Sequence, residues 1–172
     1  MSIPGVTPSA NITQIQAIAA CRNAGKRLLT NGEWTAAALG TPDPGTDDGT
    51  SDCNVDSTSA VANTGSRSLC VSDTGAFDMV GNLAEWVVDW VPGSTGVCPG
   101  WGGFSDDLMC LAGASTIGGP GALIRGGVFD FGAFAGVFAV DGVGDPSYSS
   151  PGVGLRCARE PKFWGGVGPL GT

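Results

Sequence analysis

The stretch GAFDMVGNLAEWVVDW, residues 75–90, carries the pattern that decides the fold of this chain. Side chains alternate with a period of two from residue 85 to residue 91: one face holds Trp86, Val88 and Trp90, and the other holds Glu85, Val87 and Asp89. That period is typical of a β-strand, because successive side chains of a strand point to opposite faces. We therefore expect a strand here, with further elements before and after it in the sequence.

Two helices are expected before this strand. The first covers residues 12–26 and would be capped by Asn11. Its apolar face would consist of Ile12, Ile15, Ile18 and Ala19. The second would begin with a capping box between Thr30 and Glu33 and would end near Gly40.

Long irregular segments and short strands make up the rest of the chain. Residues 41–74 and 92–120 are rich in Gly, Pro, Asp and Ser. A loop as long as the first normally needs a constraint, and a disulfide between Cys53 and Cys70 would supply one. Short strands are expected in ALIRGG, AGVFAV and VGLRCAR. Helices followed by short strands and long loops predict an α+β fold, and the length predicts a single domain over residues 1–172.

The chain is acidic, with 16 Asp and Glu against 8 Lys and Arg and a net charge of −8. Such a charge argues against a nucleic acid or an anionic membrane surface as the partner. No apolar run approaches the roughly 18 residues of a spanning helix, so membrane insertion is not expected. The first residues, MSIPGVTPSANITQ, lack the basic start and apolar centre of a signal peptide.

Six cysteines and the absence of histidine limit the metal chemistry of the chain. No two cysteines form a CxxC pair, so a zinc site would need four widely separated thiolates and is disfavoured. Disulfides are the most economical interpretation, and they would imply an oxidising or hyperthermophilic setting. Reduced, buried cysteines are the remaining alternative.

Four segments resemble, in the same order, motifs of the formylglycine-generating enzyme (sulfatase-modifying factor) family. They are KRLLTNGEWTAAA (residues 26–38), GAFDMVGNLAEWVVDW (75–90), LIRGG (123–127) and GLRCAR (154–159). The resemblance extends from about Pro8 to Arg159, nearly the whole chain. It implies an α+β, C-type lectin-like fold of the formylglycine-generating enzyme subtype, with two N-terminal helices, short antiparallel strands and long loops.

The residues that carry catalysis in that family have no counterpart in this sequence. Its enzymes hold copper with two cysteines just after the RGG motif, where this chain reads VFDFGAFAGVF. Ergothioneine-type relatives bind iron through histidine, and this chain has none. We therefore expect no enzyme activity and neither copper nor iron as a cofactor. The alternative is a sulfatase-modifying-factor enzyme or a degenerate accessory member of that family.

Residues 126–159 closely resemble the variable region of diversity-generating retroelement variable proteins, in which an error-prone reverse transcriptase rewrites chosen codons. The resemblance implies a non-catalytic, hypervariable recognition protein that contacts an unknown protein or other macromolecular surface through side chains facing solvent. The ligand-binding positions would be Val128, Asp130, Phe131, Phe134, Val143, Gly144, Asp145, Tyr148, Ser150, Pro151 and Gly152. Surface display on a phage, a bacterium or an archaeon, or an extracellular location, follows from the same resemblance.

Aromatic side chains among these positions would be the contact anchors, because rigid rings give a large contact area at a small entropic cost. Phe131, Phe134 and Tyr148 stand among Gly, Ser and Asp, which are poor core neighbours, so we expect them to be exposed. Phe129 is instead expected in the supporting frame, and Phe138 in the core.

The resemblance to the enzyme family also implies a structural calcium ion beside the GNLAEW turn. Its ligands would be the carboxylates of Asp78 and Glu85 and the backbone carbonyls of Gly81 and Leu83. Ligation by oxygen alone suits Ca²⁺. The alternative is that Asp78 caps a turn and Glu85 pairs with a buried arginine, either Arg125 or Arg156.

The same relatives bridge the positions of Cys21 and Cys157, which implies that disulfide here. With it we expect the pairs Cys53–Cys70 and Cys98–Cys110.

Overall fold

The computed structural model describes residues 3–56, 60–115 and 118–159. Its helices are α1 (Gln14–Asn23) and α2 (Asn31–Ala38), with a 3-10 turn η1 (Gly132–Phe134). Its strands are β1 (Arg27–Leu28), β2 (Ala84–Pro92), β3 (Met109–Cys110), β4 (Pro120–Arg125), β5 (Val140–Asp141), β6 (Val153–Leu155) and β7 (Cys157–Ala158). Within this described part of the chain, no helix has the length and apolar character needed to cross a bilayer.

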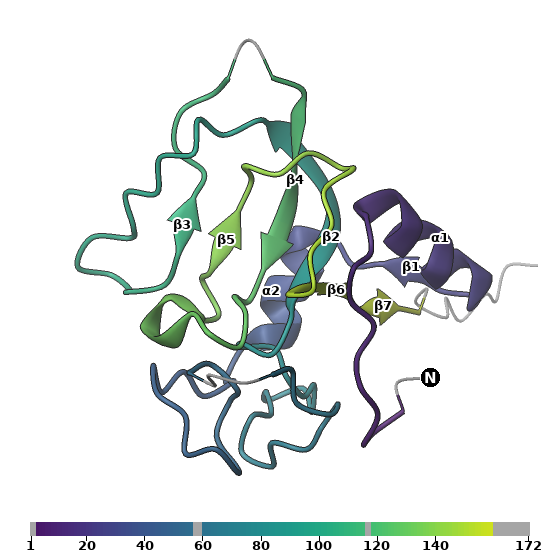
Figure 1. The fold of residues 1–172 in the computed structure, drawn as a ribbon, viewed down its shortest axis with the longest axis vertical. Coiled ribbons are helices and arrows are strands. Elements are labelled where there is room, and N and C mark those ends of the chain that lie inside the picture. Colours follow the sequence, from purple (N-terminus) through teal and green to yellow (C-terminus); the bar gives the residue numbers. More distant parts are fainter. Residues whose placement is uncertain (1–2, 57–59, 116–117, 160–172) are drawn as a thin grey trace, which may run out of the picture.

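A five-stranded sheet forms the centre of the fold, in the spatial order β3-β5-β4-β2-β6 (Figure 1). Strand β2 pairs antiparallel with β4 and parallel with β6, while β1 and β7 form a separate antiparallel pair. The strand expected from the alternation over residues 85–91 is therefore present, and it lies between two neighbours.

The later strands are shorter than the sequence predicts. A strand over AGVFAV is wrong for most of that segment, because β5 begins only at Val140. The preceding residues form a turn instead, in which the Ala139 amide donates to the Gly136 carbonyl at 3.1 Å. The segment VGLRCAR divides at Arg156, since β6 pairs with β2 and β7 pairs with β1.

Helix α1 turns a different face to the core from the expected one. Its buried residues are Gln14, Ala17 and Cys21, whereas Ile15 is 54% exposed. Two long-range contacts explain this orientation. The Gln14 side-chain amide donates to the carbonyl of Val87 on β2 at 2.6 Å, and Cys21 is held in a disulfide.

Both helices begin at capping boxes. Helix α1 is capped by Thr13 together with Gln16, two residues later than the expected Asn11. Helix α2 is capped by Thr30 and Glu33, as expected. Each box satisfies backbone amides that a helix start leaves without intrahelical partners.

Two apolar clusters lie on opposite faces of the sheet. Trp86 of β2 packs in one cluster with α1, and Trp34 of α2 packs in the other with Leu123. Both rings are almost fully buried, and burying a ring of this size contributes roughly 4–6 kcal/mol. In Figure 1, α2 lies behind the sheet and α1 lies beside it.

Three disulfides fasten the loops and ends to this core, and they are the pairs expected from the sequence: Cys21–Cys157, Cys53–Cys70 and Cys98–Cys110. The first joins α1 to β7. The second closes a loop inside residues 41–74, and the third ties the segment after β2 to β3. The long irregular segments thus carry covalent constraints of their own.

Candidate functional site

A groove of about 640 Å³ opens over the sheet, within the usual size range of ligand sites. Its floor consists of strand residues: Ala84 of β2, Ile124 of β4, Asp141 of β5 and Val153 of β6. Its walls come from two loops, within residues 127–131 and 143–152. The lining is mostly apolar.

The predicted variable positions converge on this groove. All of them line it except Phe134 and Asp145. They come from two segments on either side of β5, so their proximity depends on how the strands pair. The proximity of the two segments could not be predicted from the sequence.

The three aromatic anchors are exposed, as expected. The exposed fractions are 36% for Phe131, 60% for Phe134 and 45% for Tyr148. The Tyr148 ring also makes an edge contact with Trp86, with centroids 6.4 Å apart. This contact holds the ring beside the groove while leaving nearly half of it accessible.

Four other predicted positions are only half-buried rather than facing solvent: Val128, Gly144, Ser150 and Gly152. Val128 packs against the core cluster on the α1 side of the sheet. A Cβ at Gly152 would lie 2.9 Å from a methyl carbon of Val128, so these two positions are sterically linked. Val128 therefore belongs partly to the frame.

Phe129 and Phe138 behave as parts of a supporting frame. Both are half-buried, so the expectation of a core position for Phe138 is wrong. The Phe138 ring packs instead against Trp101 and Phe104, with centroids 6.2 and 4.9 Å away. Phe104 is 68% exposed, so this aromatic cluster reaches the surface beside the variable region.

The loop over residues 143–152 is held at both ends by backbone hydrogen bonds. At its start, the Ala122 amide of β4 donates to the Gly144 carbonyl at 2.9 Å. At its end, the Ala84 amide of β2 donates to the Gly152 carbonyl at 2.9 Å. These bonds involve no side chain, so they persist whichever side chains the loop carries.

The loop over residues 127–134 is supported from below in the same way. The Phe129 amide donates to the Asn82 carbonyl at 3.2 Å, and the Gly132 amide donates to the Val55 carbonyl at 2.7 Å. The Leu108 amide donates to the Phe134 carbonyl at 2.9 Å. Three separate segments therefore fix the path of this wall.

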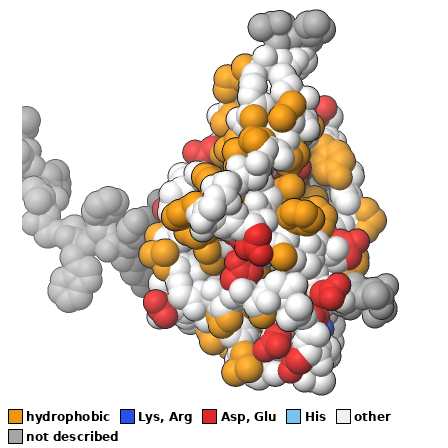
Figure 2. Space-filling view, turned by 90° about the vertical axis from the view of Figure 1, so that its left-hand side faces the viewer, with side chains coloured by type: hydrophobic (Ala, Val, Ile, Leu, Met, Phe, Trp, Pro, Cys, Tyr) orange, Lys and Arg blue, Asp and Glu red, His pale blue; other side chains and the backbone are white. Residues whose placement is uncertain are grey.

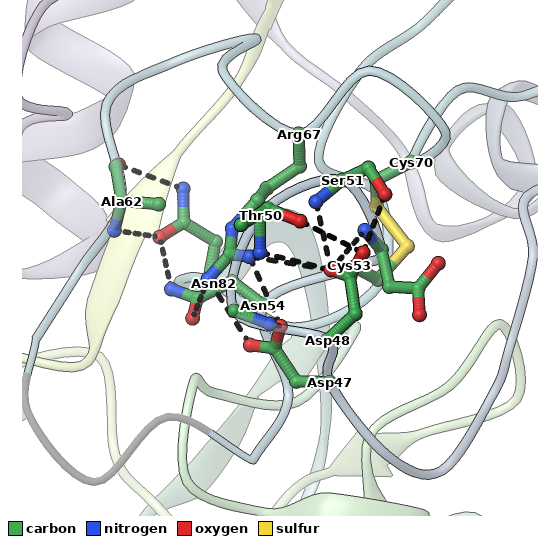
Figure 3. Close-up of polar contacts among 12 residues, drawn as sticks. Asp47, Asp48, Thr50, Ser51, Cys53, Asn54, Ala62, Arg67, Cys70 and Asn82 are labelled. Atoms are coloured by element: carbon green, nitrogen blue, oxygen red, sulfur yellow. Dashed lines mark hydrogen bonds and ion pairs between the residues drawn. A yellow bond between two sulfur atoms is a disulfide. The ribbon is translucent and has the colours of Figure 1, made fainter.

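A buried polar network underlies that support (Figure 3). The Arg67 guanidinium donates to Asp47 at 3.0 and 3.1 Å and to the Asn54 side-chain oxygen at 3.2 Å. The Asn54 amide in turn donates to the Asn82 side chain at 3.1 Å, and Asn82 exchanges two hydrogen bonds with Ala62. Sequence analysis missed this network, because its members lie in irregular loops with no periodic pattern.

Glu85, one of the residues predicted to bind calcium, has protein partners of its own. The Glu85 carboxylate accepts hydrogen bonds from the Arg156 Nε at 3.1 and 3.2 Å and from the Trp34 indole at 2.8 Å. A second Arg156 nitrogen donates to the Phe77 carbonyl at 2.7 Å. This matches the alternative in which Glu85 pairs with a buried arginine.

Asp78 also has a structural partner, since its carboxylate accepts the Gly65 amide at 2.7 Å. Burial raises the pKa of Asp78. Across the described residues, no group of three or more His, Cys, Asp or Glu side chains is arranged to hold a metal ion. Calcium binding by Asp78, Gly81, Leu83 and Glu85 stays a prediction.

Asp43 and Asp107 form an acidic pair beside the frame, in which Asp43 is exposed. Asp107 is buried, and its carboxylate accepts the Phe138 amide at 2.6 Å. Burial and the neighbouring Asp107 carboxylate raise the pKa of Asp43 to about 7. This pair joins the loop that follows α2 to the turn at Gly136. The Asp107 carboxylate packs so closely over Gly136 that the position cannot admit a Cβ.

Figure 2 shows the face that lies over β3 and η1, where apolar and acidic side chains are intermixed. Very little basic surface is visible in this view. The mixture agrees with the net charge of −8.

Comparison with solved structures finds proteins of the same fold. Major Tropism Determinant M1 Variant matches with a TM-score of 0.56 and 23% identity, over 84% of this chain and 36% of that chain. The U1 Variant matches with a TM-score of 0.55 and 24% identity, over the same shares of the two chains. This chain therefore spans about a third of the length of the tropism determinants. Treponema denticola variable protein 1 matches with a TM-score of 0.58 and 19% identity, over 92% of this chain and 75% of that chain.

These likenesses confirm the expected α+β, C-type lectin-like fold, which the chain shares with a protein named as variable. No curated protein matches the chain. The model of the sulfatase-modifying factor enzyme 1-like domain matches residues 2–161, nearly the whole sequence. On that match and on the fold, the chain belongs to the sulfatase-modifying factor enzyme 1-like family.

Proposed function

We propose that the chain is a non-catalytic recognition protein that binds macromolecular surfaces, above all proteins, through the groove and its aromatic rim. One observation carries the proposal. Positions assigned as variable from the sequence, which are scattered over residues 128–152, meet around a single concave surface. Phe131, Phe134 and Tyr148 supply the exposed apolar area that such contacts require.

The chemistry of the cysteines supports a role without catalysis. All six are consumed in disulfides, and the chain has no histidine. Thiolates and imidazoles are the ligands that copper and iron prefer in oxidative enzymes. Among the described residues that line the groove there is neither cysteine nor histidine, which disfavours a sulfatase-modifying enzyme or an accessory member as the alternative.

Diversification by a retroelement is part of this proposal. The hydrogen bonds that hold both walls run through the backbone, so side chains can change while the walls keep their path. Display at the surface of a phage or a cell, or secretion from it, would place such a face where ligands are met. Formation of three disulfides agrees with an oxidising surrounding.

A display library tests the proposal directly. The exposed positions Asp130, Phe131, Phe134, Val143, Asp145 and Tyr148 are randomised together, and clones are selected for binding to lysozyme as an arbitrary folded protein. We expect folded binders to emerge. A matched library at exposed positions far from the groove in sequence, Ile15, Leu39 and Leu69, should yield none.

Two results would refute the proposal. The first is a library in which most clones lose the cooperative unfolding transition, because the randomised residues would then belong to the core. The second is a tight copper site in the oxidised protein, which would favour the enzyme alternative.

A further inference from the structure

We propose that the groove takes a positively charged side chain, an arginine or a lysine on the surface of a protein ligand, with Asp141 as its counter-ion. This inference rests on the function proposed above and specifies the chemistry that the groove selects. Sequence analysis did not single out Asp141, because its position depends on strand register.

Asp141 stands on the groove floor. It is the partner of Ile124 across the β5–β4 pair, so its side chain shares the sheet face of Ile124, and both residues line the groove. Its Oδ1 accepts the Val143 amide at 2.7 Å. Within the described residues, Oδ2 has neither a hydrogen bond nor an ion pair, which leaves one carboxylate oxygen available for a ligand.

The surroundings of this carboxylate disfavour a lone negative charge. Asp141 is half-buried beneath an apolar lining, and burial raises its pKa. A cation placed beside it would restore the stability of the charged form. The groove therefore contains a carboxylate whose charged form a positively charged partner would stabilise.

Among the described residues, no side chain supplies that partner. Arg125 lines the groove by position, but its guanidinium donates to the Val137 carbonyl at 3.0 Å and lies 4.9 Å from the Trp34 ring, on the α2 side of the sheet. No other Lys or Arg of residues 3–56, 60–115 and 118–159 lines the groove, whereas Asp130 adds a second carboxylate to its wall. As far as the chain is described, the groove is thus acidic and has no counter-ion of its own.

The shape of the site suits a long basic side chain. Arginine and lysine carry an apolar stem below the charge, and the stem would lie along the apolar walls. The rings of Phe131 and Tyr148 line the same groove, where a cation gains further from aromatic faces. The exposed Phe134, outside the groove, adds contact area that a small free cation would not use, which favours a protein ligand.

Cyclic peptides selected by phage display against the intact chain test the assignment. We expect the selected peptides to share one Arg or Lys. Replacing that residue by norleucine should weaken binding about tenfold or more, as should the D141N change in the protein, because either one leaves a buried charge unpaired. Both changes together should cost little more than one, since they remove the same contact.

The choice of variants keeps the result interpretable. D141N retains an acceptor for the Val143 amide, so the loop keeps its hydrogen bond. D73N is the matched control, because that carboxylate is exposed and does not line the groove, and we expect it to change affinity by less than about twofold.

The two proposals fail in different ways. Peptides that weaken with F131A and Y148A, but carry no basic residue or bind D141N as tightly as wild type, would overturn the charge assignment and leave the recognition role standing. Peptides that F131A and Y148A leave unaffected would show that the groove is not the binding face, and would overturn both.

Discussion

The Arg156 guanidinium lies against the Glu85 carboxylate, with its Nε 3.1 and 3.2 Å from the two oxygens, and so joins the end of β6 to the centre of the sheet. The two side chains are only 23% and 9% exposed. Removing one member of a buried pair leaves an uncompensated charge and costs about 3–5 kcal/mol. We expect R156A to lower the free energy of unfolding by about 3 kcal/mol in a urea titration.

A matched control for R156A is R159A, because Arg159 is exposed, and its effect should stay within about 0.5 kcal/mol. If the two variants lost equal stability, the pair between Arg156 and Glu85 would not be a structural contact.

The response to calcium follows from the same pair. Because Arg156 occupies the Glu85 carboxylate, we expect neither calcium nor EDTA to shift the Tm of the wild-type protein in a thermal scan. The R156A variant frees that carboxylate beside Asp78, so calcium should raise its Tm instead. A calcium-dependent rise in the wild type would show that the four predicted ligands bind despite the guanidinium.

Asp43 makes stability depend on pH. Its pKa in the folded protein is raised from 3.8 to about 7, so between those values the folded state holds a proton that the unfolded state has lost. The contribution of Asp43 to the free energy of unfolding should therefore be complete below about pH 4. It should decline as the pH rises towards 7. Unfolding titrations at pH 5 and pH 8 measure the difference.

The D43N variant should flatten this pH dependence, whereas D130N, at an exposed position away from Asp107, should leave it unchanged. A profile that D43N does not alter would assign the dependence to another group.

Val128 and Gly152 should behave as one steric unit. A Cβ at Gly152 would lie 2.9 Å from a Val128 methyl carbon, so we expect G152A to cost about 1–2 kcal/mol on its own. Adding V128A removes the clash, and the double variant should be more stable than the sum of the single changes by about 1 kcal/mol. In contrast, a Cβ at Gly144 lies 3.5 Å from Tyr148, an ordinary contact, so G144A and Y148A should be additive.

The disulfides should differ in their contribution to stability. Cys21–Cys157 spans 136 residues of sequence, against 12 for Cys98–Cys110. In the chain-entropy model a longer closed loop gives a larger effect, about 4–5 kcal/mol against about 3. We expect the C21S/C157S variant to unfold at lower urea than C98S/C110S. The reverse order would indicate that the shorter bridge holds structure that the longer one does not.

Structural features that depend on neighbouring residues could be predicted from the sequence, whereas features that depend on distant contacts could not. Strand β2 and the cap of α2 follow from alternation and from a capping box, which depend only on neighbouring residues. The buried face of α1 was predicted wrongly, because a hydrogen bond from Gln14 to Val87 overrides its apolar pattern. The variable positions came from a resemblance to known motifs, whereas their convergence on a groove depends on the pairing of β5 with β4.

The roles of Asp141 and Arg67 could not be predicted from the sequence, because both depend on contacts between distant segments. The role of Asp141 arises from its register opposite Ile124, and that of Arg67 from partners 13 and 20 residues away across an irregular loop. Neither residue belongs to a spacing pattern that a linear reading would select.

The cysteines that flank the groove segment, Cys110 and Cys157, leave every residue between them free of cross-links. A cysteine-free cassette exchanged between these two points would leave the three pairings unchanged. Clones with unrelated specificities would then share one oxidative folding route, and a population of them could mature under identical conditions in the same compartment.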